Sequence, residues 1–232
     1  MDNESKNLEI MKGADNYNQW IYDNVKNFIG EKILEVGPGL GSMTQFFTKK
    51  KILVGTDISE SNLSYLNSKF NNIKRFKFLK YDISKKYDSL VKYDFDTVVC
   101  INVLEHIKED QHAINNMYNI LVEGGRLILL VPAFQSLYGS IDKSDQHYRR
   151  YNKRDLLKII KNSGFKMVSC RYMNFPGFFG WYFHSKLLKV KVHKKNDLSI
   201  FNKLVPLFKF LESIKSPPFG LSLVCICEKE KT

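Results

Sequence analysis

The stretch Ile33-Leu34-Glu35-Val36-Gly37-Pro38-Gly39-Leu40-Gly41 decides the fold. Its first four residues are typical of a buried strand, and three glycines follow within five residues. Glycine lets the backbone approach a ligand closely and adopt φ angles that other residues avoid. A helix is expected after Gly41, and its first N–H groups are free to bind a ligand. This order of elements indicates a nucleotide-type site, and an ordinary tight turn is the alternative interpretation.

The spacing of the glycines separates two classes of nucleotide site. A dinucleotide fingerprint requires G-x-G-x-x-G, whereas here Ser42 occupies the third fingerprint position. Glu35 stands just before the first glycine, where a carboxylate would repel a pyrophosphate. The same carboxylate suits a cationic group, such as the amino group of S-adenosylmethionine near its sulfonium.

Further carboxylates follow the next two predicted strands. Asp57 lies where doubly wound folds place a carboxylate that binds ribose hydroxyls, and Ile58 follows it directly. Asp82 can accept a hydrogen bond from an adenine amine while Ile83 packs on the ring. Either aspartate alone is also typical of a helix N-cap. Together with Glu35, they place three carboxylates at three successive strand ends.

Short apolar runs alternate with helical patterns over the first 170 residues, which is typical of a doubly wound α/β fold with a parallel sheet. We predict strands at residues 32–36, 52–56, 76–81, 96–101, 126–131, 165–170 and 222–227. We predict helices at residues 15–29, after Gly41, and at 59–70, 108–121 and 153–162. Gly124 and Gly125 are expected to cap the 108–121 helix. A long loop is expected over residues 132–152.

The length of 232 residues predicts a single domain spanning residues 1–232. Residues 174–216 interrupt the alternation and are predicted to form a helical insertion that covers the acceptor site. Ten lysines against four acidic residues give residues 185–232 a formal charge of +6, half of the +12 of the whole chain. Cys100, Cys170, Cys225 and Cys227 are expected to be reduced and buried, with no metal site. The start of the chain lacks a signal peptide and no apolar run could span a membrane, so a cytoplasmic protein is expected.

Four motifs together resemble the class I S-adenosylmethionine-dependent methyltransferases: EVGPGLG (35–41), TDIS (56–59), YDIS (81–84) and CINVLEHI (100–107). The resemblance covers roughly Tyr17 to Val131. It implies a Rossmann-like, mainly parallel seven-stranded sheet whose last strand is antiparallel, with S-adenosylmethionine as cofactor. The donor contacts that it implies are Glu35, Gly37, Pro38, Gly39, Gly41, Asp57, Ile58, Asp82, Ile83 and Asn102. Tyr17 and Trp20 match aromatic residues before the first motif; we assign Tyr17 to the substrate site and Trp20 to the core.

The loop after the fifth strand contains His147-Tyr148-Arg149-Arg150-Tyr151. It resembles the H-x-R-R-Y segment of a type 11/12 methyltransferase subgroup that is associated with glycan or lipid-linked pathways. His147 is the first choice for a general base and His106 the second. Arg149 and Arg150 can bind an anionic acceptor. In the alternative interpretation, His147 and Arg149 only fix the loop.

Three functions fit these observations. The first is methyl transfer to a small-molecule, glycan or lipid-linked acceptor. A nicotinamide-dependent oxidoreductase is the second, although Ser42 and Glu35 oppose it, and a non-catalytic binding protein is the third. Nucleic acid is not an expected partner because no aromatic-interleaved motif is present. The basic, aromatic segment 175–195 either lies on a membrane surface or forms a lid whose aromatic residues join the core, and we prefer the lid.

Overall fold

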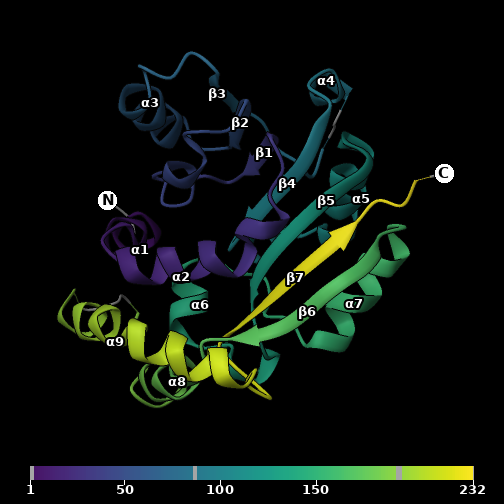
Figure 1. Cartoon of the computed structure of the whole chain (residues 1–232). Helices are drawn as coiled ribbons and strands as arrows, with labels where there is room; N and C mark the ends of the chain where they lie inside the picture. Colours follow the sequence, from purple (N-terminus) through teal and green to yellow (C-terminus); the bar gives the residue numbers. More distant parts are fainter. Residues whose placement is uncertain (1–2, 86–87, 192–194, 232) are drawn as a thin grey trace.

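A seven-stranded sheet with the order β3-β2-β1-β4-β5-β7-β6 runs through the molecule (Figure 1). The structure is a computed structural model that describes residues 3–85, 88–191 and 195–231. Within them the strands are β1 (Lys32–Val36), β2 (Ile52–Asp57), β3 (Phe76–Lys80), β4 (Phe95–Ile101), β5 (Leu121–Pro132), β6 (Lys166–Met173) and β7 (Ser222–Glu228). Strand β7 is antiparallel to both of its neighbours, and the other pairs are parallel. The predicted α/β fold, with a mainly parallel sheet and an antiparallel last strand, is confirmed.

Helices cover both faces of the sheet. In the described residues they are α1 (Asn3–Lys12), α2 (Asp15–Val25), α3 (Glu60–Lys69), α4 (Asp88–Val91), α5 (Asp110–Ile120), α6 (Ser140–Ser144), α7 (Lys153–Asn162), α8 (Phe175–Trp181) and α9 (Lys195–Ile214). A π-helix, η5 (Tyr182–Leu187), continues α8, and short 3-10 helices are η1 (Lys26–Phe28), η2 (Thr44–Phe47), η3 (Leu104–His106) and η4 (Gln135–Leu137). Buried residues of α4, α5 and α7 pack on one face, and those of α2, α3 and α9 pack on the other.

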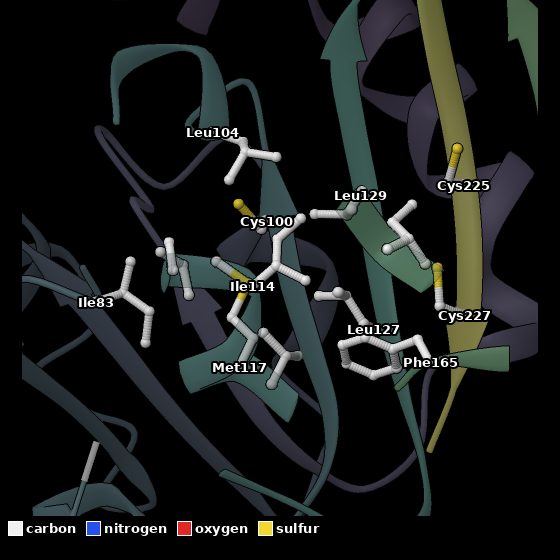
Figure 2. Close-up of a cluster of buried hydrophobic side chains, with 14 of the residues drawn as sticks. Ile83, Cys100, Leu104, Ile114, Met117, Leu127, Leu129, Phe165, Cys225 and Cys227 are labelled. Atoms are coloured by element: carbon white, nitrogen blue, oxygen red, sulfur yellow. The ribbon is translucent and has the colours of Figure 1, made fainter. Parts of the chain in front are cut away.

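The apolar strand runs explain this double cover. Successive residues of a strand point to opposite faces, so Leu127 and Leu129 join one core while Ile128 and Leu130 join the other. Figure 2 shows the first of these cores between the sheet and α5, with Cys100 and Met117 among its members. A strand that is apolar at every position must be buried on both faces, as the sequence predicts.

Two expected local structures are wrong. The helix after Gly41 is only the 3-10 turn η2, whose Thr and Phe residues have low helix propensity. Gly124 and Gly125 do not cap α5, because the strand β5 begins directly after Ile120. The N–H of Gly124 donates to the carbonyl of Lys229 (2.8 Å), and the N–H of Lys229 donates to the carbonyl of Gly125 (2.9 Å). These glycines therefore pair with the end of the chain.

The prediction that all four cysteines are reduced needs one correction. Cys170 on β6 lies directly opposite Cys225 on β7, and the structure joins the two in a disulfide. The register of the two strands, which the sequence alone does not reveal, brings these residues together. Cys100 and Cys227 are free and buried, as expected.

The segment between β6 and β7 forms an antiparallel pair of helical rods, α8 with η5 and then α9. At one end, the Glu212 carboxylate on α9 accepts a hydrogen bond from the N–H of Phe175 (2.8 Å). At the other end, Nδ1 of His184 lies 3.9 Å from the Asp197 carboxylate. Figure 1 shows α8 and α9 at one end of the sheet, near α2 and α6. No helix in the described ranges is both long and apolar enough to cross a membrane.

Candidate active site

A cavity of about 450 Å³ lies beyond the carboxyl ends of β1 and β4. In the sheet order these strands are neighbours, and the chain leaves them toward opposite sides. Open α/β sheets bind ligands at such a switch point. The cavity wall includes Glu35, Gly37, Pro38 and Gly39 after β1, Asn102, Glu105 and His106 after β4, and His147 and Arg150 after β5. Tyr17 from α2 and Trp181 and His184 from the α8–η5 rod complete this part of the wall.

The glycine-rich turn after β1 forms the floor of the cavity. Gly37, Gly39 and Gly41 have φ angles of +65°, +54° and +77°, which side chains with a Cβ rarely adopt. A Cβ added to Gly37 would lie 2.4 Å from Cγ2 of Val103. Because Gly37 has no side chain, the turn can pass close to Val103 after β4 and still line the cavity. Gly41 itself packs toward α3 and does not line the cavity.

Glu35 places a buried carboxylate at the cavity. Its side chain is 3% exposed, and its Oε2 accepts a hydrogen bond from the Thr44 hydroxyl (2.7 Å). Burial raises the pKa of Glu35 to about 7, although the hydrogen bond from Thr44 opposes the shift. A cationic ligand group beside this carboxylate would restore the charged form. The site therefore fits the amino group of S-adenosylmethionine.

Asp57 and Ile58 lie at the end of β2. The Asp57 carboxylate accepts hydrogen bonds from the N–H of Ser59 (2.8 Å), the N–H of Gly39 (3.2 Å) and the Asn62 side chain (3.3 Å). It thus braces the glycine turn from the neighbouring strand, outside the cavity wall. Ile58 is 71% exposed beside it.

Asp82 and Ile83 lie after β3 and also stand outside the cavity wall. The Asp82 carboxylate accepts hydrogen bonds from the N–H (2.9 Å) and the hydroxyl (2.6 Å) of Ser84. Ile83 is buried in the core, and its carbonyl accepts a hydrogen bond from Asn116 (2.7 Å). The structure thus gives both residues local partners.

Asn102, predicted as a donor contact, and Tyr17, predicted as a substrate-site residue, both line the cavity. Asn102 has a φ of +52°, a left-handed conformation in which asparagine is enriched. Tyr17 is buried, and its ring packs edge-on against Phe201 of α9 with 5.7 Å between centroids. Trp20, the other aromatic residue of this helix, lies in the core.

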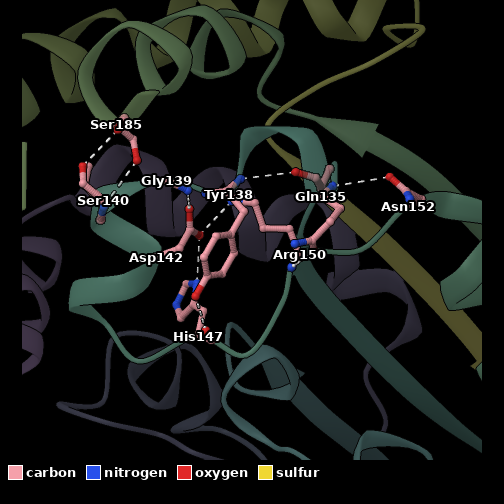
Figure 3. Close-up of polar contacts among 11 residues, drawn as sticks. Gln135, Tyr138, Gly139, Ser140, Asp142, His147, Arg150, Asn152 and Ser185 are labelled. Atoms are coloured by element: carbon pink, nitrogen blue, oxygen red, sulfur yellow. Dashed lines mark hydrogen bonds and ion pairs between the residues drawn. The ribbon is translucent and has the colours of Figure 1, made fainter. Parts of the chain in front are cut away.

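A buried polar network holds the loop after β5 (Figure 3). The fully buried Asp142 carboxylate accepts hydrogen bonds from the N–H of Gly139 (2.8 Å) and from Nε of Arg150 (2.7 Å). Nδ1 of His147 lies 3.0 Å from Oδ1 of Asp142. The hydroxyl of Tyr138 donates to the carbonyl of His147 (2.7 Å). The contact between Nδ1 and Asp142 therefore fixes the orientation of the His147 imidazole.

Two histidines and a glutamate meet at the cavity beside this network. One side-chain oxygen or nitrogen atom from each of Glu105, His106 and His147 lies within 4.8 Å of the other two. The two imidazole rings contact edge-to-face with 4.5 Å between their centroids. Burial and the neighbouring His147 lower the pKa of His106 to about 4. Burial also opposes the charged form of His147, but Asp142 and Glu105 outweigh it and raise its pKa. His147 is therefore the stronger base of the pair.

The two adjacent arginines have different environments. Arg150 is 3% exposed and lines the cavity, and its guanidinium stacks on the Trp181 ring at 4.2 Å. Arg149 points elsewhere: it pairs with Asp110 (2.5 Å) and donates to the carbonyl of Lys108 (2.8 Å). The structure therefore brings Arg150 and His147 together at the cavity but leaves Arg149 outside it.

Two residues of this site are absent from the sequence prediction. Asp142 stands five residues before His147, and only the folded loop brings its carboxylate to Nδ1 of the imidazole. Glu105 directly precedes His106 in the fourth motif and is 1% exposed. Among the described residues, its Oε2 atom has no hydrogen-bond partner. Burial raises the pKa of Glu105 to about 7.

Comparisons with known proteins point to one family of similar domains. Residues 34–127, from β1 into β5, match the methyltransferase domain family. An uncharacterized methyltransferase of Schizosaccharomyces pombe is 28% identical over 159 residues, which are 60% of this chain and 56% of that relative. This chain thus spans little more than half of that relative's length.

Solved structures agree on the fold. A putative methyltransferase from Bacillus halodurans superimposes with a TM-score of 0.61 at 18% identity, over 91% of this chain and 99% of that one. Magnesium protoporphyrin IX methyltransferase from Synechocystis, solved with bound S-adenosylhomocysteine, gives a TM-score of 0.55 at 18% identity, over 94% and 82% of the two chains. Residues 34–127 are thus similar to the methyltransferase domain family, and the chain shares the Rossmann-like fold of these solved structures.

Proposed function

We propose that the protein transfers the methyl group of S-adenosylmethionine to a nucleophile bound in the cavity described above. One observation carries the proposal: the glycine turn with Glu35 and the network around His147 line the same cavity, from different strands. A donor held at β1 and an acceptor held by the loop after β5 would then meet inside one enclosed space. Alignment of two bound reactants can lower a barrier by roughly 7 to 11 kcal/mol.

On this proposal, the donor occupies the side of the cavity formed by β1 and β4 and extends out of it past the end of β2. S-adenosylmethionine supplies an activated methyl group on a sulfonium. Glu35 faces its amino group, and Gly37, Pro38 and Gly39 allow the backbone to approach the methionine portion together with Asn102. Asp57 and Ile58 lie at the next strand end and would contact the ribose and adenine side. Gly41, Asp82 and Ile83 stay predictions as donor contacts. In the structure, Gly41 packs against Leu66 and Phe70, Asp82 binds Ser84, and the carbonyl of Ile83 binds Asn116.

The acceptor occupies the side formed by the loop after β5 and the α8–η5 rod. His147 presents Nε2 to the cavity because Asp142 occupies Nδ1, so it can take the proton that the acceptor loses. Asp142 and Arg150 act as positioning residues for this imidazole. His106, with its lowered pKa, stays in the neutral form beside it. Arg149 is not assigned an acceptor role, since its guanidinium is engaged by Asp110.

The acceptor class follows from the wall of the cavity. Tyr17, Trp181 and Phe201 give this wall an aromatic character, and Arg150 and His184 add basic groups. Such an aromatic wall suits a small molecule, a glycan or a lipid-linked intermediate. The resemblance of the loop to the H-x-R-R-Y segment favours the glycan or lipid-linked acceptors.

A labelled-methyl transfer assay tests the proposal. The purified protein is incubated with S-adenosylmethionine carrying a radioactive methyl group and with a cell extract, which is then separated into lipid, polysaccharide, protein and small-molecule pools. We expect label in one pool. The His147→Ala variant should retain donor affinity and lose roughly 10² or more of the rate, which is the usual contribution of a general base. Absence of label in every pool, or an unchanged rate in the variant, would contradict the proposed roles.

A further inference from the structure

An unusually apolar surface lies on the outside of the helices between β6 and β7. Of the 15 large apolar side chains that are exposed in the described residues, 11 belong to α8, η5, the residue after it or α9. They are Phe179, Tyr182, Phe183, Leu187, Leu188, Ile200, Leu204, Leu207, Phe210, Leu211 and Ile214. Soluble proteins rarely gather exposed apolar side chains in this way unless the surface binds something. We call this set the outer apolar surface.

The α9 helix has two apolar stripes, and only one of them is needed for the fold. Its inner stripe includes Phe201, Val205 and Phe208, which pack on the core that contains α2. The second stripe, Ile200, Leu204, Leu207, Leu211 and Ile214, repeats every three or four residues and is 43% to 70% exposed. Residues at this spacing share one side of a helix. The second stripe therefore faces away from the protein.

The segment that carries the outer apolar surface is also rich in lysine. The described residues of this segment include Lys186, Lys189, Lys191, Lys203 and Lys215, whereas a sixth lysine, Lys209, pairs with Asp23 of α2. Its two acidic residues already have partners inside the rod pair, since Asp197 faces His184 and Glu212 binds the N–H groups of Asn174 and Phe175. The surface that remains is thus apolar and cationic. Residues 192–194, which complete the basic run of the sequence, lie outside the described residues.

We propose that the outer apolar surface docks on an anionic lipid bilayer. An interfacial helix of this kind inserts its apolar side chains at the boundary of the headgroups, while lysines bind anionic lipids. A second copy of this chain fits less well, because it would bring lysines of both copies together in a protein of net charge +12. The inner sides of the same rods line the cavity through Gly177, Trp181 and Phe201. Docking would therefore bring the cavity next to the membrane, although the docking itself does not depend on methyl transfer.

Vesicle sedimentation tests this surface with the full chain. The vesicles contain phosphatidylcholine, either alone or with about 30 mol% phosphatidylglycerol. We expect the protein to pellet with the anionic vesicles and much less with the neutral ones, and added salt should weaken binding. The double variant Leu211→Ser, Ile214→Ser should bind at least tenfold more weakly. The matched control Val91→Ser, Val168→Ser, which changes two exposed apolar residues elsewhere, should bind like the wild type.

Charge variants measure the electrostatic contribution to vesicle binding. Lys186→Glu, Lys191→Glu should lower the affinity for anionic vesicles at least tenfold, since each lysine near such a surface contributes roughly fivefold. Lys158→Glu, Lys161→Glu on α7 carries the same charge change and should have less effect. The docking is wrong if the wild type stays in the supernatant with both vesicles, or if the surface variants bind as well as their controls. It is equally wrong if light scattering shows a dimer that Leu211→Ser, Ile214→Ser dissociates.

The affinity for S-adenosylhomocysteine, measured on each variant, keeps the two proposals apart. Variants of the outer apolar surface should bind it like the wild type, which also shows that they are folded. Vesicle binding without S-adenosylhomocysteine binding would leave the docking standing and contradict the proposed function. The reverse result would contradict the docking alone.

Discussion

If the proposed function is right, Glu35 is the residue whose chemistry is most tightly linked to the donor. Its carboxylate is buried with one hydroxyl partner, so the neutral form is stabilised and the pKa rises to about 7. A cationic ligand favours the ionised form and would lower that pKa. The free energy of binding therefore includes the loss of a proton whenever the pH is below 7.

This linkage predicts a pH-dependent affinity for S-adenosylhomocysteine. The affinity should fall as the pH drops below about 7, by up to tenfold per pH unit, because the protonated Glu35 must ionise before binding. Above pH 7 the contribution of Glu35 should be constant. Calorimetric titration in buffers of different ionisation enthalpy measures the proton release directly. Glu35→Gln should bind more weakly at pH 8 and show a flatter profile, and a wild-type profile that rises toward low pH would contradict the assignment.

Asp142 is the residue on which the loop after β5 depends. Its carboxylate forms hydrogen bonds with the guanidinium of Arg150, the imidazole of His147 and the N–H of Gly139, and the carboxylate itself is buried. Burial opposes its charge, but His147 and Arg150 outweigh this and lower the pKa of Asp142. Removal of the carboxylate would leave the Arg150 charge buried without compensation.

Asp142→Asn should therefore destabilise the protein by about 3 kcal/mol or more, which is typical when one partner of a buried ion pair is removed. Urea unfolding followed by circular dichroism measures this. Glu60→Gln, which breaks the exposed pair with Lys80, serves as the control and should leave the midpoint nearly unchanged. Equal midpoints for Asp142→Asn and the wild type would show that the network does not hold the loop.

The sequence identifies some site residues because a local pattern surrounds them. Glu35 and the glycines stand in one contiguous motif, and His147 and Arg150 stand in another. The sequence does not reveal that Arg149 and Arg150 point in different directions. The direction of each side chain depends on the partner that it meets in the folded protein. Asp110 and Asp142, which attract the two guanidinium groups, lie on different elements.

The junction between β6 and β7 illustrates packing at the scale of an element. Gly220 precedes β7, and a Cβ at this position would lie 2.4 Å from the carbonyl oxygen of Met173 at the end of β6. Backbone atoms of a paired strand cannot move aside as a flexible side chain can. The start of β7 therefore has no room for a larger residue here.

Gly220→Ala should lower the free energy of unfolding by about 1 to 3 kcal/mol, as overpacking does. Gly180→Ala on α8 is the matched control, because a Cβ there meets nothing within 4 Å. That variant should be unchanged or more stable by up to about 1 kcal/mol, since alanine favours helix. Chemical denaturation of both proteins gives the comparison. Equal stability of the two variants would contradict the close approach of β6 and β7.

Elements were predictable where the hydrophobic pattern was strong. The predicted strand 32–36 and helix 153–162 coincide with β1 and α7, because an apolar run and an amphipathic pattern define them. The short α4 and α6 were not predicted, since one turn of helix leaves no period to detect. The helix expected after Gly41 is only the 3-10 turn η2, because its Thr and Phe residues have low helix propensity.

At the scale of the whole molecule, the order of the strands creates the site. The neighbouring positions of β1 and β4 open a crevice, and the rods between β6 and β7 cover it with residues that lie more than 130 positions after Glu35. A sequence pattern predicts the parallel sheet and hence the crevice. It does not predict the register that pairs Cys170 with Cys225, nor that α9 packs on α2.

The central claim is that this cavity binds the methyl donor. Calorimetric titration of the purified chain with S-adenosylhomocysteine, with NADH as the comparison ligand, tests it most directly. We expect one binding site for S-adenosylhomocysteine with a dissociation constant well below millimolar and no binding of NADH. Asp57→Ala should weaken the binding of S-adenosylhomocysteine at least tenfold in a protein that stays folded. No heat of binding with millimolar S-adenosylhomocysteine, or tighter binding of NADH, would contradict it.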